Sequence, residues 1–243
     1  MNQPNARKIL GVIGGMGPQA TCLFYQQVIH RTVAACDQDH IPMIILSHNT
    51  IPDRTQAILS GSGDAVYSLL LADAKSLEQN GASAIAIPCN TSHYFADRLQ
   101  DEIGIPIINM IRETVHAMIN RGMKKIGILA TDGTIQSGLY QTECSRFGAE
   151  AIIPSQKIQA IVMHIIYNEI KRGLPGSRSL FAKIDGELRQ KGCDGAILAC
   201  TELSCFAAEH DLLDYYTDAM GILVERCILA CGGQLKLSES TSC

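Results

Sequence analysis

The strongest constraint on the fold of this chain is an internal repeat, in which two motifs of the first half recur in the same order in the second half. A basic-led apolar run around Gly11 recurs around Gly127, and an apolar run that ends in Cys89 recurs as one that ends in Cys200. The spacing between the two motifs is similar in both copies. Two half-chains with the same internal spacing predict two similar lobes related by a pseudo-twofold axis.

Each half alternates short apolar runs with longer amphipathic stretches, a pattern typical of βαβ units and a parallel sheet. The expected strands are Ile9–Ile13, Met43–Ser47, Ala84–Pro88, Ile105–Asn109, Lys125–Ala130, Glu150–Ile153 and Gly195–Ala199. The expected helices are Gln19–Ala34, Asp64–Asn80, Ile111–Arg121, Ser137–Arg146, Gln156–Arg172 and Ser179–Lys191. We therefore expect an α/β fold of two pseudosymmetric lobes, each a mainly parallel sheet flanked by helices, with the active site in the cleft between them. The first lobe is expected to span residues 1–112, completed by 214–243, and the second to span 113–213.

Composition and charge exclude several classes of function. The net charge of −4 offers no basic field for a polyanion, so nucleic acid is not an expected partner. No apolar run approaches the roughly 18 residues of a membrane span, and the first residues lack the apolar core of a secretory signal. The 10 cysteines are scattered singly without a C-x-x-C pair, which favours reduced thiols in a cytoplasmic protein over disulfides or structural zinc.

The two repeated cysteines carry the functional hypothesis. Cys89 and Cys200 each end an expected strand, and ligands of parallel sheets bind at the carboxyl ends of strands. A twofold axis would point both thiols into one cleft from opposite sides. Inverting a stereocentre needs a base on one face and an acid on the other, and two thiols with an ordinary pKa near ~8.5 can share these roles. Either cysteine alone would more often be a packing residue, but the matched pair favours catalysis.

Polar residues beside the cysteines could hold a carboxylate and the carbanion formed from it. Those that follow the two strands, or lie in the polar loop after the repeated strand, are Asn90, Thr91, Ser92, Thr134, Thr201 and Glu202. Glu202 could orient the site or cap the following helix. His93 could tune the thiolate, although such a histidine is more often a satisfied buried group.

Two cations and a glycine loop each allow more than one interpretation. Arg54 could clamp a carboxylate or pair with its neighbour Asp53 in a solvated loop. Lys171 could serve the site or compensate the dipole at the end of a helix. The loop Gly15–Ala20 is a variant of the dinucleotide fingerprint, but Pro18 also suits the first turn of a helix after a tight turn. A dinucleotide-binding protein is therefore an alternative from a different class.

With these residues in view, the chain resembles the aspartate/glutamate racemase superfamily, and within it the aspartate racemase branch. The resemblance extends from Ile9 to about Ala230. The stretches that carry it are Gly14–Pro18, Ile51–Thr55, Pro88–His93, Ile105–Ile111, Leu129–Thr134 and Cys200–Ser204.

The resemblance implies a homodimer that needs neither pyridoxal phosphate nor a metal. It assigns Cys89 and Cys200 as the proton-abstracting and proton-donating pair. It implies that the α-carboxylate and amino group are held by Asn90, Thr91, Thr134 and Thr201. It further implies that Arg54 and Lys171 grip the side-chain carboxylate of a small acidic amino acid, and that Met16 lines the site.

The expected function is interconversion of L- and D-aspartate without a cofactor. Glutamate racemases carry an acidic residue in the first glycine loop and a histidine after the second Cys-Thr, where this chain has Gly14 and Glu202. That difference favours the aspartate branch. The same cysteine pair could also serve glutamate or broad-specificity racemisation, or isomerisation of a diacid such as maleate, and these alternatives stay open.

Overall fold

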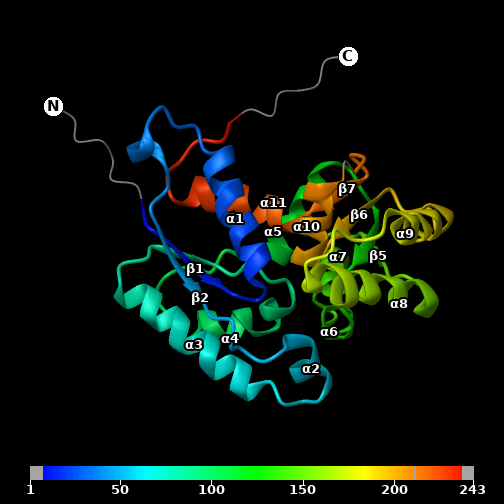
Figure 1. Ribbon diagram of the computed structural model, residues 1–243, viewed down its shortest axis with the longest axis horizontal. Helices are drawn as coiled ribbons and strands as arrows, with labels where there is room; N and C mark the ends of the chain where they lie inside the picture. The colour runs from blue at the N-terminus through cyan, green and yellow to red at the C-terminus, as the bar shows by residue number, and fades with distance from the viewer. Residues whose placement is uncertain (1–7, 211, 237–243) are drawn as a thin grey trace.

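The computed structural model describes residues 8–210 and 212–236, which form two parallel sheets flanked by helices (Figure 1). The first sheet has the order β2-β1-β3 and the second the order β5-β4-β6-β7, and every pairing is parallel. The strands are β1 (Leu10–Gly14), β2 (Met43–Ser47), β3 (Ala84–Ala86), β4 (Lys125–Leu129), β5 (Glu150–Ile152), β6 (Gly195–Leu198) and β7 (Tyr216–Asp218). In both sheets the first strand of the repeat lies between its two successors. The expected α/β class with two lobes is confirmed.

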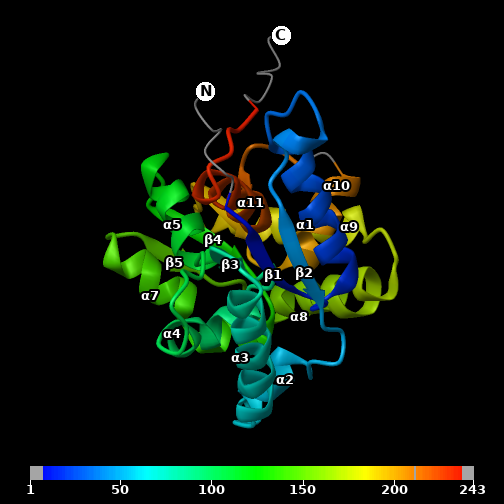
Figure 2. The ribbon, with the colours of Figure 1, turned by 90° about the vertical axis from the view of Figure 1, so that its left-hand side faces the viewer.

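Helices cover both sheets and fill the space between them. They are α1 (Pro18–Arg31), α2 (Arg54–Leu59), α3 (Asp64–Gln79), α4 (Ala96–Gln100), α5 (Met110–Asn120), α6 (Asp132–Ser137), α7 (Leu139–Arg146), α8 (Gln156–His164), α9 (Arg178–Gln190), α10 (Thr201–Glu209) and α11 (Ala219–Ala230). Figure 2 shows α3 along the first sheet, and in Figure 1 α5, α10 and α11 lie between the two sheets. Within the described residues, none of the helices combines the length and apolar character that a membrane crossing demands.

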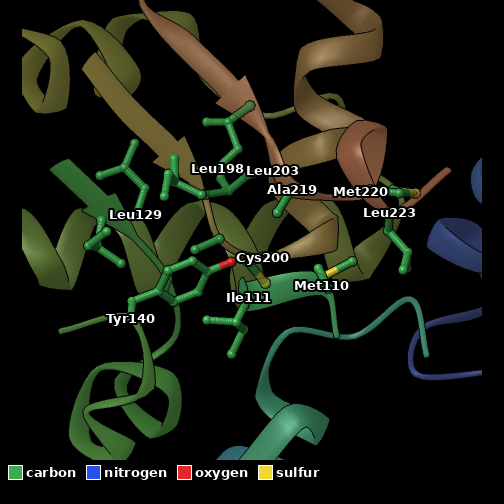
Figure 3. Packing of buried hydrophobic residues seen from close by; sticks show 14 of the residues in the cluster. Met110, Ile111, Leu129, Tyr140, Leu198, Cys200, Leu203, Ala219, Met220 and Leu223 are labelled. Carbon is green, nitrogen blue, oxygen red and sulfur yellow. The ribbon is translucent and has the colours of Figure 1, made fainter. Parts of the chain in front are cut away.

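Two apolar cores hold the lobes. One packs α3 against the first sheet through residues such as Leu70, Leu77 and Ile85. The larger core joins the second sheet to α5, α10 and α11, and Figure 3 shows Cys200 packed within it beside Tyr140 and Ile111. Cys200 is therefore enclosed by packed, buried side chains at the point where β6 meets α10.

The pairing register places the functional segments. Leu10 lies opposite both Met43 and Ala84, and Ile126 lies opposite Gly195. Because the strands are parallel and start together, the segments that follow them emerge at one edge of each sheet. These edges carry Cys89 in the first lobe and Cys200 in the second.

The structure differs from the expected elements at several places. The expected strand Ile105–Asn109 makes only a single bridge, between Ile107 and Ile85, and Pro106, its second residue, has no N–H to donate. The expected helix over 156–172 is α-helical only to residue 164. A π turn and a 3-10 turn complete it. The expected helix over 137–146 is preceded by α6 and divided from it by Gly138, whose φ is +68°.

Strand β7 was not expected, because three residues are too few for a pattern of alternation. It lies in the segment 214–243, which we expected to complete the first lobe, yet it pairs with β6 of the second sheet. The following helix α11 packs against α1 and α5, between the sheets. The division of the chain into lobes at these boundaries stays a prediction.

Candidate active site

One small pocket receives side chains from both lobes. Its lining residues are Met16, Asp53, Arg54, Thr55, Cys89, Asn90, Thr91, Thr131, Tyr167, Lys171, Cys200, Thr201 and Glu202. A larger hollow continues from it toward the surface past Pro18, Gln19 and Gly173. Residues from distant parts of the chain thus converge on one small, polar space.

The two cysteines predicted from the repeat both line this pocket. Each is only 6% exposed, and neither takes part in a disulfide. Cys89 follows β3, and Cys200 is the N-cap residue of α10 directly after β6. Both thiols therefore line the same pocket, one from each lobe.

The Glu202 carboxylate lies between Cys200 and Lys171. The Cys200 Sγ donates to Glu202 Oε2 at 2.9 Å, and Lys171 Nζ lies 3.1 Å from Glu202 Oε1. Burial and then the Glu202 charge raise the pKa of the Cys200 thiol well above its ordinary value. Burial lowers the pKa of Lys171, but Glu202 and Cys200 outweigh it, and the net shift is upward. Glu202 therefore contacts two side chains of the pocket, Cys200 and Lys171. The N-cap position of α10 is taken by Cys200 and not by Glu202.

Arg54 is a buried part of the pocket wall, with 8% of its surface exposed. Its guanidinium donates to the carbonyl oxygens of Ile51 (3.2 Å), Pro52 (3.0 Å) and Met16 (3.3 Å). Burial lowers the pKa of Arg54. The Cys89 sulfur and, to a smaller extent, Asp53 raise that pKa, and the net shift is upward. Arg54 Nε is buried without a partner among the described residues.

A cluster of hydroxyl groups crosses from one lobe to the other. Thr131 bonds to Thr55 at 3.0 Å and to Thr91 at 3.1 Å, and Thr91 bonds to Thr134 at 2.9 Å. Thr91 and Thr134 were predicted as site residues from the sequence, and Thr131 belongs to the polar loop expected after the repeated strand, whereas Thr55 was not predicted. Thr134 lies behind the residues that line the pocket and reaches the site through Thr91.

The Asn90 amide is held by a residue that the sequence did not indicate. Tyr140 is fully buried in α7, and its hydroxyl donates to Asn90 Oδ1 at 2.6 Å across the lobes. Burial raises the pKa of Tyr140 well above its ordinary value, so this hydroxyl keeps its proton. Asn90 Nδ2 is buried without a partner among the described residues. With Arg54 Nε it gives the pocket two unpaired donors, which suit a carboxylate.

Asp53 and Tyr167 also join the lobes beside the pocket. The Tyr167 hydroxyl donates to the Asp53 carboxylate at 3.0 Å, and Lys171 Nζ lies 4.9 Å from the centre of the Tyr167 ring. Asp53 also caps α2 by accepting from the Gln56 amide at 2.9 Å. Tyr167 precedes Lys171 by four residues, so the helical period was the one sequence signal that could have indicated it.

Ser92 and His93 support the site rather than line it. Ser92 is fully buried, its hydroxyl donates to the Met16 sulfur at 3.4 Å, and it is not among the residues that line the pocket, so its contact with substrate stays a prediction. His93 Nε2 accepts from the Met110 amide at 3.1 Å, and Nδ1 lies 3.0 Å from the Cys89 carbonyl oxygen, to which it donates. Burial lowers the pKa of His93, which keeps the imidazole neutral. It is a satisfied structural group.

The glycine loop after β1 packs tightly against the segment after β2. Gly15 has a φ of +86°, and a Cβ there would lie 2.5 Å from the backbone nitrogen of His48. Gly17 and Pro18 start α1 as its N-cap and first residue. This close approach explains the glycines and brings Met16 into the pocket wall.

Comparison with known proteins agrees with this arrangement. Residues 13–227 match the model of the Asp/Glu/hydantoin racemase family. The broad specificity amino-acid racemase RacX of Bacillus subtilis is 30% identical over 81% of this chain and 86% of its own. A glutamate racemase of Corynebacterium diphtheriae is 30% identical over 56% of this chain and 51% of its own. The aspartate racemase structure of Picrophilus torridus superposes with a TM-score of 0.77 at 28% identity, over 94% of this chain and 96% of that one.

Proposed function

Since this chain belongs to the Asp/Glu/hydantoin racemase family, we propose that it interconverts L- and D-aspartate with Cys89 and Cys200 as its two acid–base groups. The observation that carries the proposal is the pair of thiols, equally buried and contributed by opposite lobes to one pocket. The resemblance further supports a cytoplasmic homodimer that needs no added cofactor.

The proposed reaction is a proton transfer across the substrate. One cysteine, as thiolate, removes the proton from Cα while the other, as thiol, delivers a proton to the opposite face. The negative charge that develops between these steps spreads onto the α-carboxylate. Donors directed at that carboxylate stabilise it, and the Asn90 amide and the Thr91 hydroxyl are placed to do so.

The charges of the pocket support an acidic substrate. Arg54 and Lys171 both line it, so a second carboxylate on the substrate would meet a cation. A Cβ at Gly14 would lie 2.4 Å from Thr21 Cγ2, which leaves no room there for the acidic side chain of the glutamate branch. Because any diacid would suit these cations, glutamate or broad-specificity racemisation and maleate-type isomerisation are the alternatives.

The first experiment is to incubate the protein with L-aspartate in deuterium oxide without added cofactor. We expect D-aspartate to accumulate with deuterium at Cα, because the proton delivered to the new face comes from a thiol that exchanges with solvent. Chiral chromatography with mass spectrometry measures both quantities. Failure to exchange aspartate, with exchange of glutamate or isomerisation of maleate instead, would contradict the assigned substrate.

Tyr140 offers a test of the carboxylate site. In Tyr140→Phe the Asn90 amide loses the hydrogen bond that orients it, a loss of about 0.5–1.5 kcal/mol. We expect the KM for aspartate to rise about 2- to 12-fold with a smaller change in kcat, because the carboxylate is bound in both the ground state and the transition state. Tyr215→Phe is the matched control, since it loses a tyrosine hydrogen bond to the Cys193 carbonyl outside the pocket. Equal effects of the two variants on KM would contradict this role.

A further inference from the structure

The two cysteines occupy equivalent places in the repeat but have opposite electrostatic surroundings. Cys89 lines the pocket together with the guanidinium of Arg54, a cation, and the Cys89 sulfur raises the pKa of Arg54. The Cys200 sulfur instead donates to the Glu202 carboxylate, an anion, at 2.9 Å. The two lobes therefore place their cysteines at equivalent backbone positions, but the charged side chains near the two sulfurs have opposite signs.

We propose that Glu202 is a positioning residue that keeps Cys200 as the protonated member of the pair when the enzyme is free. The role in catalysis rests on the proposed two-cysteine function. The protonation of Cys200 itself follows from its contact with Glu202.

Both oxygens of the Glu202 carboxylate are engaged. Oε1 lies 3.1 Å from Lys171 Nζ, and Oε2 accepts from Cys200. Glu202 is 6% exposed, so water does little to screen its charge. The single positive charge of Lys171 balances one anion. A thiolate on Cys200 would place a second anion 2.9 Å from the carboxylate, in a site where like charges repel strongly.

The charged group that lines the pocket with Cys89 is a cation, in contrast to the anion beside Cys200. Arg54 is buried, and the effect of Cys89 on its pKa exceeds that of Asp53. Asp53 already accepts hydrogen bonds from Tyr167 and from the amide of Gln56. The pocket therefore holds a buried cation on the side of Cys89, where Cys200 has the Glu202 anion.

This arrangement defines the order of proton transfers. Free enzyme accepts the enantiomer whose Cα proton faces Cys89, and the Cys200 thiol protonates the opposite face. The product leaves Cys89 as thiol and Cys200 as thiolate beside Glu202, and transfer of one proton through solvent restores the free state. Because the two enantiomers have equal free energy, kcat/KM must be equal in both directions. The asymmetry is therefore measured on the free thiols.

The test is the rate at which iodoacetamide alkylates each cysteine of the substrate-free protein, followed by peptide mass spectrometry. Only the thiolate reacts, so the rate at one cysteine, compared between proteins that differ at Glu202, reports the ionisation of that cysteine. Near neutral pH we expect slow alkylation of Cys200, because its thiol stays protonated beside the Glu202 carboxylate. In Glu202→Gln we expect the Cys200 rate to rise at least ~10-fold while the Cys89 rate stays within about twofold.

The pH profile has a defined sign. Burial and Glu202 raise the pKa of Cys200, so removing the carboxylate shifts the midpoint of its alkylation to lower pH. The other titratable or charged groups that interact with Cys200 or with Glu202 are Lys171, Tyr140, Tyr167, Arg54 and Cys205. The lysine and the arginine are cations, and burial raises the pKa of both tyrosines and of Cys205. None of these groups can replace the negative charge that is lost when Glu202 is changed to glutamine.

Two further variants separate charge from shape. Glu209→Gln, an exposed substitution on the same helix, should leave both alkylation rates unchanged. Glu202→Asp keeps the negative charge and should keep Cys200 slow, even if the glutamine variant folds poorly. An unchanged Cys200 rate in a folded Glu202→Gln, or fast alkylation of Cys200 in Glu202→Asp, would overturn the proposal. Because no substrate is present, these outcomes do not depend on whether the protein racemises aspartate.

Discussion

Replacing either Cys89 or Cys200 with alanine is expected to lower the rate of aspartate racemisation by about 10³-fold or more, the upper part of the range for loss of a positioned acid or base. Each variant lacks the acid–base group on one face of the substrate, so the proton cannot be removed from one face and replaced on the other. Chiral chromatography of aspartate measures the loss. Near-normal conversion in both directions by either variant would refute the two-base mechanism.

The residual chemistry of these variants is informative. A Cys200→Ala protein retains Cys89 and should still exchange the Cα proton of one enantiomer with deuterium, without inversion. Cys144→Ala is the matched control, since Cys144 is also buried but lies outside the pocket, and burial raises its pKa to about 11. That substitution removes a core thiol and should leave turnover close to normal while lowering thermal stability.

Arg54→Met is expected to shift substrate choice as well as overall rate. The guanidinium offers charge-assisted hydrogen bonds to a side-chain carboxylate, and losing them costs about 1.5–3 kcal/mol, or about 10- to 150-fold. Alanine has no such carboxylate, so its Cα exchange should fall much less. The measurement is the ratio of aspartate to alanine exchange in deuterium oxide.

The ratio is needed because Arg54 also supports the site. Its bonds to backbone carbonyl groups hold the glycine loop and the start of α2, so its loss affects every substrate to some extent. Arg98→Ala, at a side chain that is 55% exposed on α4, controls for loss of an arginine elsewhere. An equal fall for aspartate and alanine in Arg54→Met would remove its proposed role in specificity.

Local signals were sufficient for most of the fold. Long amphipathic stretches such as Asp64–Asn80 and apolar runs such as Met43–Ser47 predicted α3 and β2 almost to the residue, because burial on one face imposes a period on the sequence. The predictions of secondary structure were wrong where tertiary packing decides whether a strand forms. A buried apolar run with a proline, Ile105–Asn109, does not form a regular strand, and the short strand β7 exists only because β6 offers it an edge.

The site divides in the same way. Cys89, Asn90, Cys200, Thr201 and Glu202 could be placed because they directly follow strands, and parallel strands bring their ends to one edge. Thr55, Tyr140 and Tyr167 could not, because each reaches the site across the contact between lobes. The position of one lobe against the other depends on many apolar contacts that no local motif encodes.

The sequence by itself determined the α/β class, the repeat and the cysteine pair, since periodicity and strand ends are local properties. Only the tertiary structure decided how charge is distributed over that pair. The repeat makes the cysteines look equivalent, but Arg54 from the first lobe lies against one of them and Glu202 with Lys171 lies against the other. Electrostatic energy depends on distances of a few ångströms between side chains, and those distances arise only when the lobes pack together.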